Sequence, residues 1–172
     1  NTAAQNATSF NATGLTPGTN YFWRVFAVSE GALSTSLSGS QATVGAGNIS
    51  STGGGGLWSL PGTWVGGVVP TAADNVTIVP GATVTIDTGA LAFTLSVAGT
   101  LNWEATTART LISGSDVVIQ PAGIFQSAAT GTQTGHVLTV GGNLTNNGTL
   151  DFATNANTAA AGITFPGTTN AT

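Results

Sequence analysis

Short strand-like runs recur along most of this sequence at nearly constant spacing. In each run, apolar residues alternate with Thr, Ser or Asn, and a turn that contains Gly or Pro follows. The runs can be grouped into successive pairs. The first run of each pair ends at Ile78, Val97, Ile119 and Val140, at intervals of 19, 22 and 21 residues. Alternation indicates strands with one buried face, and a repeat of about 20 residues indicates a solenoid of stacked coils.

We predict two such strands in each coil. They are 76–78, 84–86, 95–97, 101–103, 117–119, 124–126, 138–140 and 150–152. A single coil cannot bury its own apolar side chains, whereas stacked coils bury them in one continuous column. The sequence therefore predicts an all-β chain that contains a right-handed parallel β-helix. A β-sandwich with similarly spaced strands is the alternative.

Composition divides the chain into three parts. Residues 1–44 hold a cluster of aromatic residues, residues 45–56 consist mostly of Gly, Ser and Ala, and residues 57–172 carry the repeat. We predict that 45–56 is a flexible linker, because Gly/Ser-rich segments behave as random coils. No polar cap follows the last strand-like run at 163–166, so we expect the solenoid to continue beyond residue 172.

The first part carries a recognisable pattern in Leu15-Thr16-Pro17-Gly18-Thr19, followed by Tyr21-Phe22-Trp23-Arg24-Val25-Phe26-Ala27. It resembles the C-terminal half of a fibronectin type III domain. The resemblance implies a tyrosine corner at Tyr21, structural roles for Pro17 and Gly18, and a last strand near 38–44. Because a complete sandwich needs about 100 residues, we expect this half to expose its inner apolar face.

A second resemblance covers most of 57–172. The opening with Trp58, Trp64 and Pro70–Ile78, and the later run Gly142–Leu150, resemble the parallel β-helix repeats of large secreted bacterial surface proteins. Such proteins are similar to adhesins and other cargo of type IX secretion, often with fibronectin type III modules beside the helix. The resemblance implies an extracellular or cell-surface location and a structural or adhesive role, as a non-catalytic shaft that presents other modules.

Charge is almost absent from the chain, which has two arginines, no lysine, six acidic residues, one histidine and no cysteine. Two cations cannot neutralise a phosphate backbone, so we expect no nucleic-acid partner. The lack of Cys excludes disulfides and thiolate metal sites. No apolar run has the length of a membrane helix, so we expect a chain that does not span a membrane. The partners left open are glycans, other surface proteins, secretion or attachment machinery, and further copies of the chain.

Few side chains could perform acid–base chemistry. Glu104 and Asp116 on neighbouring coils could face each other as the two carboxylates of a glycosidase, although capping of turns is the commoner role. Arg109 has no acid cluster beside it, so the pattern of a β-helix lyase is missing. Nothing near His136 completes a triad or a metal site, and we interpret it as a solvated loop residue. We predict no enzymatic activity and no cofactor.

Two pairs of residues, one of tryptophans and one of aspartates, have two interpretations each. Trp58 and Trp64 could form an aromatic platform that stacks on sugars, or they could cover the open first coil, which we favour because terminal repeats must hide their apolar end. Asp74 and Asp87 could offer oxygen ligands to calcium, but the glycine-rich calcium motif is absent and a turn-stabilising role is favoured.

Two other functions stay open on the sequence alone. The chain could be an ancillary carbohydrate-binding region of a secreted polysaccharide-degrading enzyme, or a catalytic β-helix whose active residues lie outside this sequence. The pattern Asn-x-Ser/Thr also recurs, which composition explains in so Asn- and Thr-rich a chain. It begins at Asn6, Asn11, Asn48, Asn75, Asn143, Asn147 and Asn170.

Overall fold

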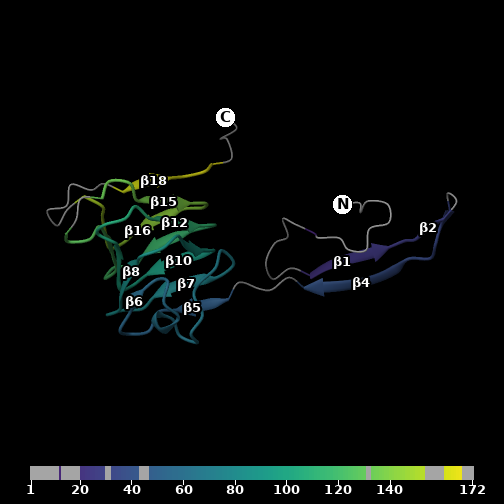
Figure 1. Ribbon diagram of the computed structural model, residues 1–172, viewed down its shortest axis with the longest axis horizontal. Coiled ribbons are helices and arrows are strands. Elements are labelled where there is room, and N and C mark those ends of the chain that lie inside the picture. Colours follow the sequence, from purple (N-terminus) through teal and green to yellow (C-terminus); the bar gives the residue numbers. More distant parts are fainter. Residues whose placement is uncertain are drawn as a thin grey trace. The chain divides into compact units, whose positions relative to one another are not determined.

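The structure is a computed structural model that describes residues 12, 20–29, 32–42, 47–130, 133–153 and 161–167. The chain forms two compact units, which comprise Asn1–Ala46 and Gly47–Thr172. Regular structure within the described residues is almost entirely β, with a single short 3-10 helix, η1 (Pro61–Thr63). Figure 1 shows the antiparallel hairpin of the first unit and the stacked strands of the second.

The second unit consists of three parallel sheets that form the sides of successive coils. The strand orders are β16-β13-β10-β7-β5, β17-β14-β11-β8-β6 and β18-β15-β12-β9. Consecutive strands lie in different sheets, and each pairs in parallel with its counterparts one coil away. This topology confirms the predicted parallel β-helix and rules out the alternative β-sandwich.

The strands of this solenoid are short. Their bounds are β5 (Asn48–Ser50), β6 (Gly56–Leu57), β7 (Asn75–Ile78), β8 (Thr83–Ile86), β9 (Ala90–Ala92), β10 (Thr94–Val97), β11 (Thr100–Trp103), β12 (Thr110–Ser113), β13 (Val117–Ile119), β14 (Ile124–Gln126), β15 (Val137–Val140), β16 (Leu144–Asn146), β17 (Thr149–Asp151) and β18 (Gly162–Thr164). All eight predicted segments coincide or overlap with one of these strands.

The prediction of two strands per coil is wrong, because a complete coil has three. The third sheet escapes notice because its alternation is blurred: small residues such as Ala90 point inward, while Leu91 and Ile112 are 37% and 43% exposed on the outer face. Val140 belongs to this third sheet, whereas Ile119 pairs with Asn146 in the first. The predicted interval of 21 residues therefore joined strands of two different sheets.

Inward side chains of successive coils stack in register, and the column that they form along the axis of the solenoid is the core. Each strand from β7 to β15 contributes buried residues at alternate positions, and all of these are at most 1% exposed. The stacked sets include Val76, Leu95 and Val117; Ile78, Val97 and Ile119; Val84, Leu101 and Phe125; and Leu111 with Leu138. Burying one such side chain stabilises the fold by about 1.5–3 kcal/mol. The predicted axial column is confirmed.

Glycine occupies the corner between the first and second sheets. Gly99, Gly123 and Gly148 lie in register just before β11, β14 and β17. A Cβ on Gly123 would overlap the carbonyl oxygen of Val97, and one on Gly148 would overlap that of Gln120. The coils thus approach each other here more closely than any side chain permits.

The predicted linker at 45–56 is wrong for its greater part. Asn48–Ser50 is strand β5 and pairs in parallel with β7, and Ser51 is buried. A Cβ on Gly55, whose φ is 64°, would overlap the carbonyl oxygen of Thr83 in the next coil. Glycine is required at Gly55 because backbone packs directly on backbone there, and Gly56 pairs with Val84 as the start of β6 in the first coil.

The first unit is an antiparallel hairpin. Strand β1 (Asn20–Val25) pairs with β4 (Leu37–Ala42), and β2 (Val28–Ser29) pairs with β3 (Ala32–Leu33). The expectation that this part exposes apolar side chains is confirmed. The exposed fractions are 81% for Phe22, 44% for Trp23, 58% for Val25, 45% for Phe26, 66% for Leu33 and 68% for Leu37.

Of the three structural residues expected in the first part, only Tyr21 lies among the described residues. Tyr21 is half-buried in β1, opposite Gln41. Its role as a tyrosine corner stays a prediction, and Pro17 and Gly18 lie outside the described residues. The predicted last strand at 38–44 corresponds to β4 as far as Ala42.

Candidate functional site

Trp58 and Trp64 are buried at the start of the solenoid, with exposed fractions of 1% and 2%. Their rings meet edge to face, with centroids 4.8 Å apart and an interplanar angle of 73°. The Trp64 Nε1–H donates a hydrogen bond of 2.8 Å to the carbonyl oxygen of Trp58. Neither ring offers a face to a sugar, so a stacking platform at these residues is excluded. The pair covers the end of the first coil.

The segment around η1 holds this cap in place. The Val65 N–H donates to the Ser50 carbonyl at 2.9 Å, and the Thr52 N–H donates to the Thr63 carbonyl at 2.8 Å. The Thr63 hydroxyl also donates to the Leu57 carbonyl at 2.6 Å. These bonds satisfy backbone groups at the outer edge of β5 and β6, which would otherwise be free to pair with another chain.

Glu104, Arg109 and His136 meet at one corner of the solenoid. Glu104 and Arg109 lie in the loop between β11 and β12, and their side chains form an ion pair with Nε and Oε1 2.6 Å apart. His136 directly precedes β15 and is 1% exposed. Its ring stacks on Trp103, with centroids 4.9 Å apart and planes inclined by 15°.

The interpretation of His136 as a solvated loop residue is wrong. The pairing of Thr110 with Val137 places it in register with Arg109, whose backbone N–H donates to its Nδ1 at 3.1 Å. Burial is the main cause that lowers the pKa of His136, and the charge of Arg109 lowers it further; a backbone hydrogen bond with Glu104 and that residue's negative charge oppose the shift. The neutral ring is therefore the stable form, with Nδ1 already occupied.

The predicted pairing of Glu104 with Asp116 is not formed. Glu104 follows β11 and pairs with Arg109, whereas Asp116 precedes β13 at a different corner. There, the Asp116 Oδ1 accepts hydrogen bonds from the backbone N–H of Asn143 at 2.7 Å and from its Nδ2 at 3.3 Å. Each carboxylate is bound to its own neighbour, and the two do not form a glycosidase pair.

Asp74 stabilises a local turn, whereas Asp87 joins two neighbouring coils. The Asp74 Oδ2 accepts from the Thr71 N–H at 2.8 Å and from the Thr71 hydroxyl at 2.6 Å. The two carboxylate oxygens of Asp87 accept from the N–H and hydroxyl of Ser59 at 2.9 and 2.5 Å. Within the described part of the chain, no group of three or more His, Asp or Glu side chains is arranged to hold a metal ion.

A polar ladder that was not predicted from the sequence runs up the corner before the first sheet. Asn75 Nδ2 donates to Asn48 Oδ1 at 3.2 Å, and the Thr94 hydroxyl donates to Asn75 Oδ1 at 2.7 Å. Asp116 and Asn143 continue the ladder in the upper coils.

The ladder also explains three of the Asn-x-Ser/Thr sequences. At Asn48, Asn75 and Asn143, an outward asparagine is followed by an inward apolar residue and then by an outward Ser or Thr. Outward residues two positions apart, with an inward residue between them, are typical of a strand with one buried face. The recurrence of this pattern at the start of β5 and β7 and just before β16 was the signal that could have revealed the ladder; β10 begins with Thr94 and β13 follows Asp116.

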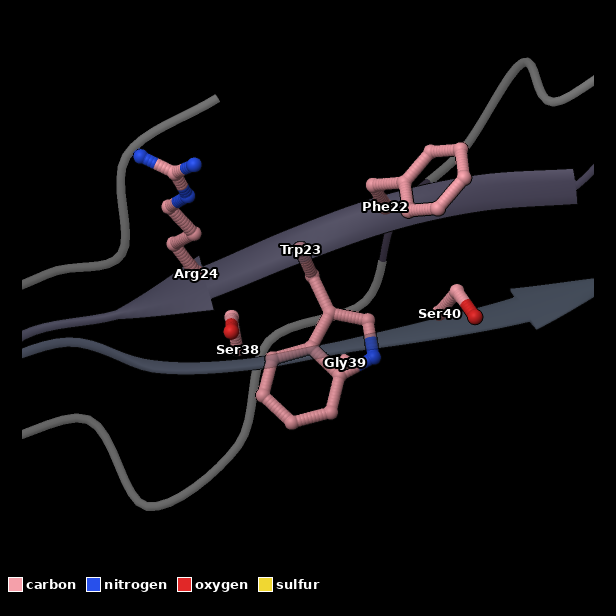
Figure 2. Close-up of a pocket in the computed structure, with 6 residues that line it drawn as sticks. All are labelled: Phe22, Trp23, Arg24, Ser38, Gly39 and Ser40. Carbon is pink, nitrogen blue, oxygen red and sulfur yellow. The ribbon is translucent and has the colours of Figure 1, made fainter.

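The first unit carries an open pocket of about 550 Å³ on the hairpin. It is lined by Phe22, Trp23 and Arg24 of β1 and by Ser38, Gly39 and Ser40 of β4. Figure 2 shows Phe22 and Arg24 on one side of β1 and Trp23 on the other, with its indole ring across Gly39. The exposed aromatic rings Phe22 and Trp23 thus lie on the hairpin, whereas Trp58 and Trp64, for which a sugar-stacking platform was the less favoured interpretation, are buried.

Comparisons with protein-family models, curated proteins and solved structures find no match for the chain. The likeness to fibronectin type III domains and to type IX secretion adhesins accordingly stays a prediction. Among the described residues, the structure has no helix of the length and apolar character required to cross a membrane.

Proposed function

We propose that this chain is a structural or adhesive segment of a large secreted or cell-surface bacterial protein, in which the solenoid is a non-catalytic shaft that presents other modules. One observation supports the proposal: every carboxylate of the solenoid accepts a hydrogen bond from another group of the protein or forms an ion pair with one. These carboxylates are Asp74, Asp87, Glu104, Asp116 and Asp151. Groups that could act as acid or base are used to hold turns and coils together.

The construction of the solenoid favours rigidity. Parallel pairing continues through all coils, the ladder at Asn48, Asn75 and Thr94 links them at one corner, and the tryptophan pair closes the first coil. The scarcity of charge also makes the stability of the shaft insensitive to salt, because there is little electrostatic energy to screen. Both properties suit a spacer outside the cell.

A distance measurement tests the rigid shaft directly. Because the chain has no cysteine, spin labels can be attached specifically at Gly53→Cys in the first coil and Thr145→Cys in the last, both exposed positions. We expect one narrow distance distribution, unchanged between low salt and about 1 M salt. A broad or salt-dependent distribution would contradict the proposal.

Activity assays test the non-catalytic part of the proposal. The intact chain is incubated with neutral and acidic polysaccharides, and new reducing ends or unsaturated products are measured. We expect no product above the level seen with a heat-denatured sample. Product that disappears in Glu104→Gln or Asp116→Asn would assign the solenoid to an enzyme class instead.

A further inference from the structure

The hairpin presents one face with a distinctive set of side chains. Phe22 lies opposite Ser40 and Arg24 lies opposite Ser38, with the Trp23–Gly39 pair between them. Because side chains of a strand alternate between faces, the side chains of Phe22, Arg24, Ser38 and Ser40 share one face and surround the backbone of the central pair. This arrangement forms the pocket in Figure 2.

The aromatic wall of the pocket is open to solvent. Phe22 is 81% exposed, which is unusual for a large apolar ring on a strand. An exposed ring of this kind packs well against a flat ligand surface that is apolar but bordered by polar groups. The C–H face of a sugar ring is such a surface.

The opposite end of the same face is cationic. Arg24 is exposed, and among the described residues the one ion pair is between Arg109 and Glu104, so its guanidinium has no carboxylate partner there. A guanidinium binds a carboxylate through two parallel N–H···O bonds, which is stronger and more directional than a neutral contact. In a chain with a net charge of −4, this is the place where an anion is attracted.

The neighbouring strand supplies hydroxyl groups. Ser38 and Ser40 are both exposed on β4, and each hydroxyl can donate and accept hydrogen bonds. A single cation flanked by hydroxyls suits a ligand with one carboxylate per ring. It does not suit a nucleic acid, whose binding requires several cations.

We propose that this face binds an acidic saccharide, with a uronate ring packed on Phe22, its carboxylate bound by Arg24, and its hydroxyls hydrogen-bonded to Ser38 and Ser40. The site adds a ligand class to the adhesive role proposed above and rests on that role for its biological setting. It does not depend on the rigidity of the solenoid, so the distance measurement and the binding measurement can fail separately.

The test is a titration of the full chain, in which binding is measured by calorimetry and by changes in amide chemical shifts. The titrants are a short oligogalacturonate, its methyl ester, which lacks the charge, and tetraglutamate, which has carboxylates but no sugar ring. We expect the oligogalacturonate to bind about ten-fold or more tightly than either comparator, with affinity that falls as salt is added.

Variants on the two faces separate this site from nonspecific adhesion. Arg24→Gln should weaken oligogalacturonate binding by about ten-fold, to the level of the ester, because a charge-assisted bond is lost. Phe22→Ala should weaken the binding of both the oligogalacturonate and its methyl ester. Val25→Ala and Leu37→Ala are matched controls, since both residues are exposed on the other face of the hairpin. They should change the dissociation constant by no more than about two-fold.

Four results would overturn the proposal. They are an absence of measurable oligogalacturonate binding, equal binding of the methyl ester, equal binding of tetraglutamate, and loss of binding in the control variants as large as that in Arg24→Gln. Circular dichroism of each variant verifies that the hairpin and solenoid are intact when binding is measured.

Discussion

His136 shows how a single side chain can become part of the core of a solenoid. Its ring continues the stack of Trp103 and Phe125, and its Nδ1 accepts the Arg109 N–H. Both features require the neutral imidazole, because a protonated Nδ1 cannot accept a hydrogen bond and a buried charge is costly. The residue thus links stability to pH.

We predict that stability decreases as the solution is acidified through the range in which unfolded histidine takes up a proton. Burial lowers the pKa of His136 in the folded state. Between that value and the ordinary value of about 6.5, the unfolded chain binds more protons than the folded one. The stabilisation is complete above about pH 6.5 and is lost as pH falls through the folded pKa.

Urea unfolding between pH 5 and pH 8 measures this effect, and the titration of His136 can be followed by NMR without ambiguity because it is the only histidine. His136→Gln, which does not titrate, is the comparison. We expect it to flatten the change in unfolding free energy over this range. An identical pH dependence in both proteins would show that other groups are responsible.

A strand of this solenoid has one face committed to the core and one to solvent, and β13 displays the contrast between two residues of the same type. Val117 is fully buried and stacks between Leu95 and Leu144. Val118, the next residue, is half-buried and points outward. The register of the parallel pairing decides which of the two side chains belongs to the column.

We predict that Val117→Asp destabilises the chain by several kcal/mol, because it buries a carboxyl group without a partner in the apolar column. Val118→Asp is the matched control and should cost no more than about 1 kcal/mol. Thermal unfolding followed by circular dichroism compares the two. Equal melting temperatures for the two variants would mean that the register of the first sheet is wrong.

At the scale of the whole molecule, the two units differ in what stabilises them. Residues 47–172 have a closed core, a capped first coil and a hydrogen-bonded ladder. The hairpin of the first unit has large apolar side chains that are 44–81% exposed on the strands β1 and β4. Since two-stranded sheets are at best marginally stable in water, the solenoid must be the independently folding part.

We predict that residues 47–172 alone fold and melt within about 2 °C of the solenoid transition of the full chain, since a shift of that size corresponds to less than 1 kcal/mol. Circular dichroism and calorimetry of both proteins provide the comparison. A loss of the transition in the shorter chain would show that the hairpin stabilises the solenoid.

The fold class could be predicted from the amino-acid sequence, since alternating runs such as Val76–Ile78 and Leu95–Val97 are local patterns that a solenoid repeats. The capping interpretation of Trp58 and Trp64, which was favoured over a sugar platform, also followed from their position at the start of the repeat. The sequence could not reveal the third sheet, because Ala90 and Leu91 reverse the expected contrast between inner and outer side chains.

Contacts between residues far apart in the sequence could be identified only from the folded structure. His136 was assigned to solvent because nothing near it in sequence is a partner, yet the register of β12 and β15 places it beside Arg109. The glycine-rich segment before Leu57 has the composition of a linker, yet it belongs to the first coil because Gly55 packs against the backbone of β8 and Gly56 pairs with that strand. The physical reason is common to these cases: strand pairing at long sequence separation fixes the contacts, and local composition does not record it.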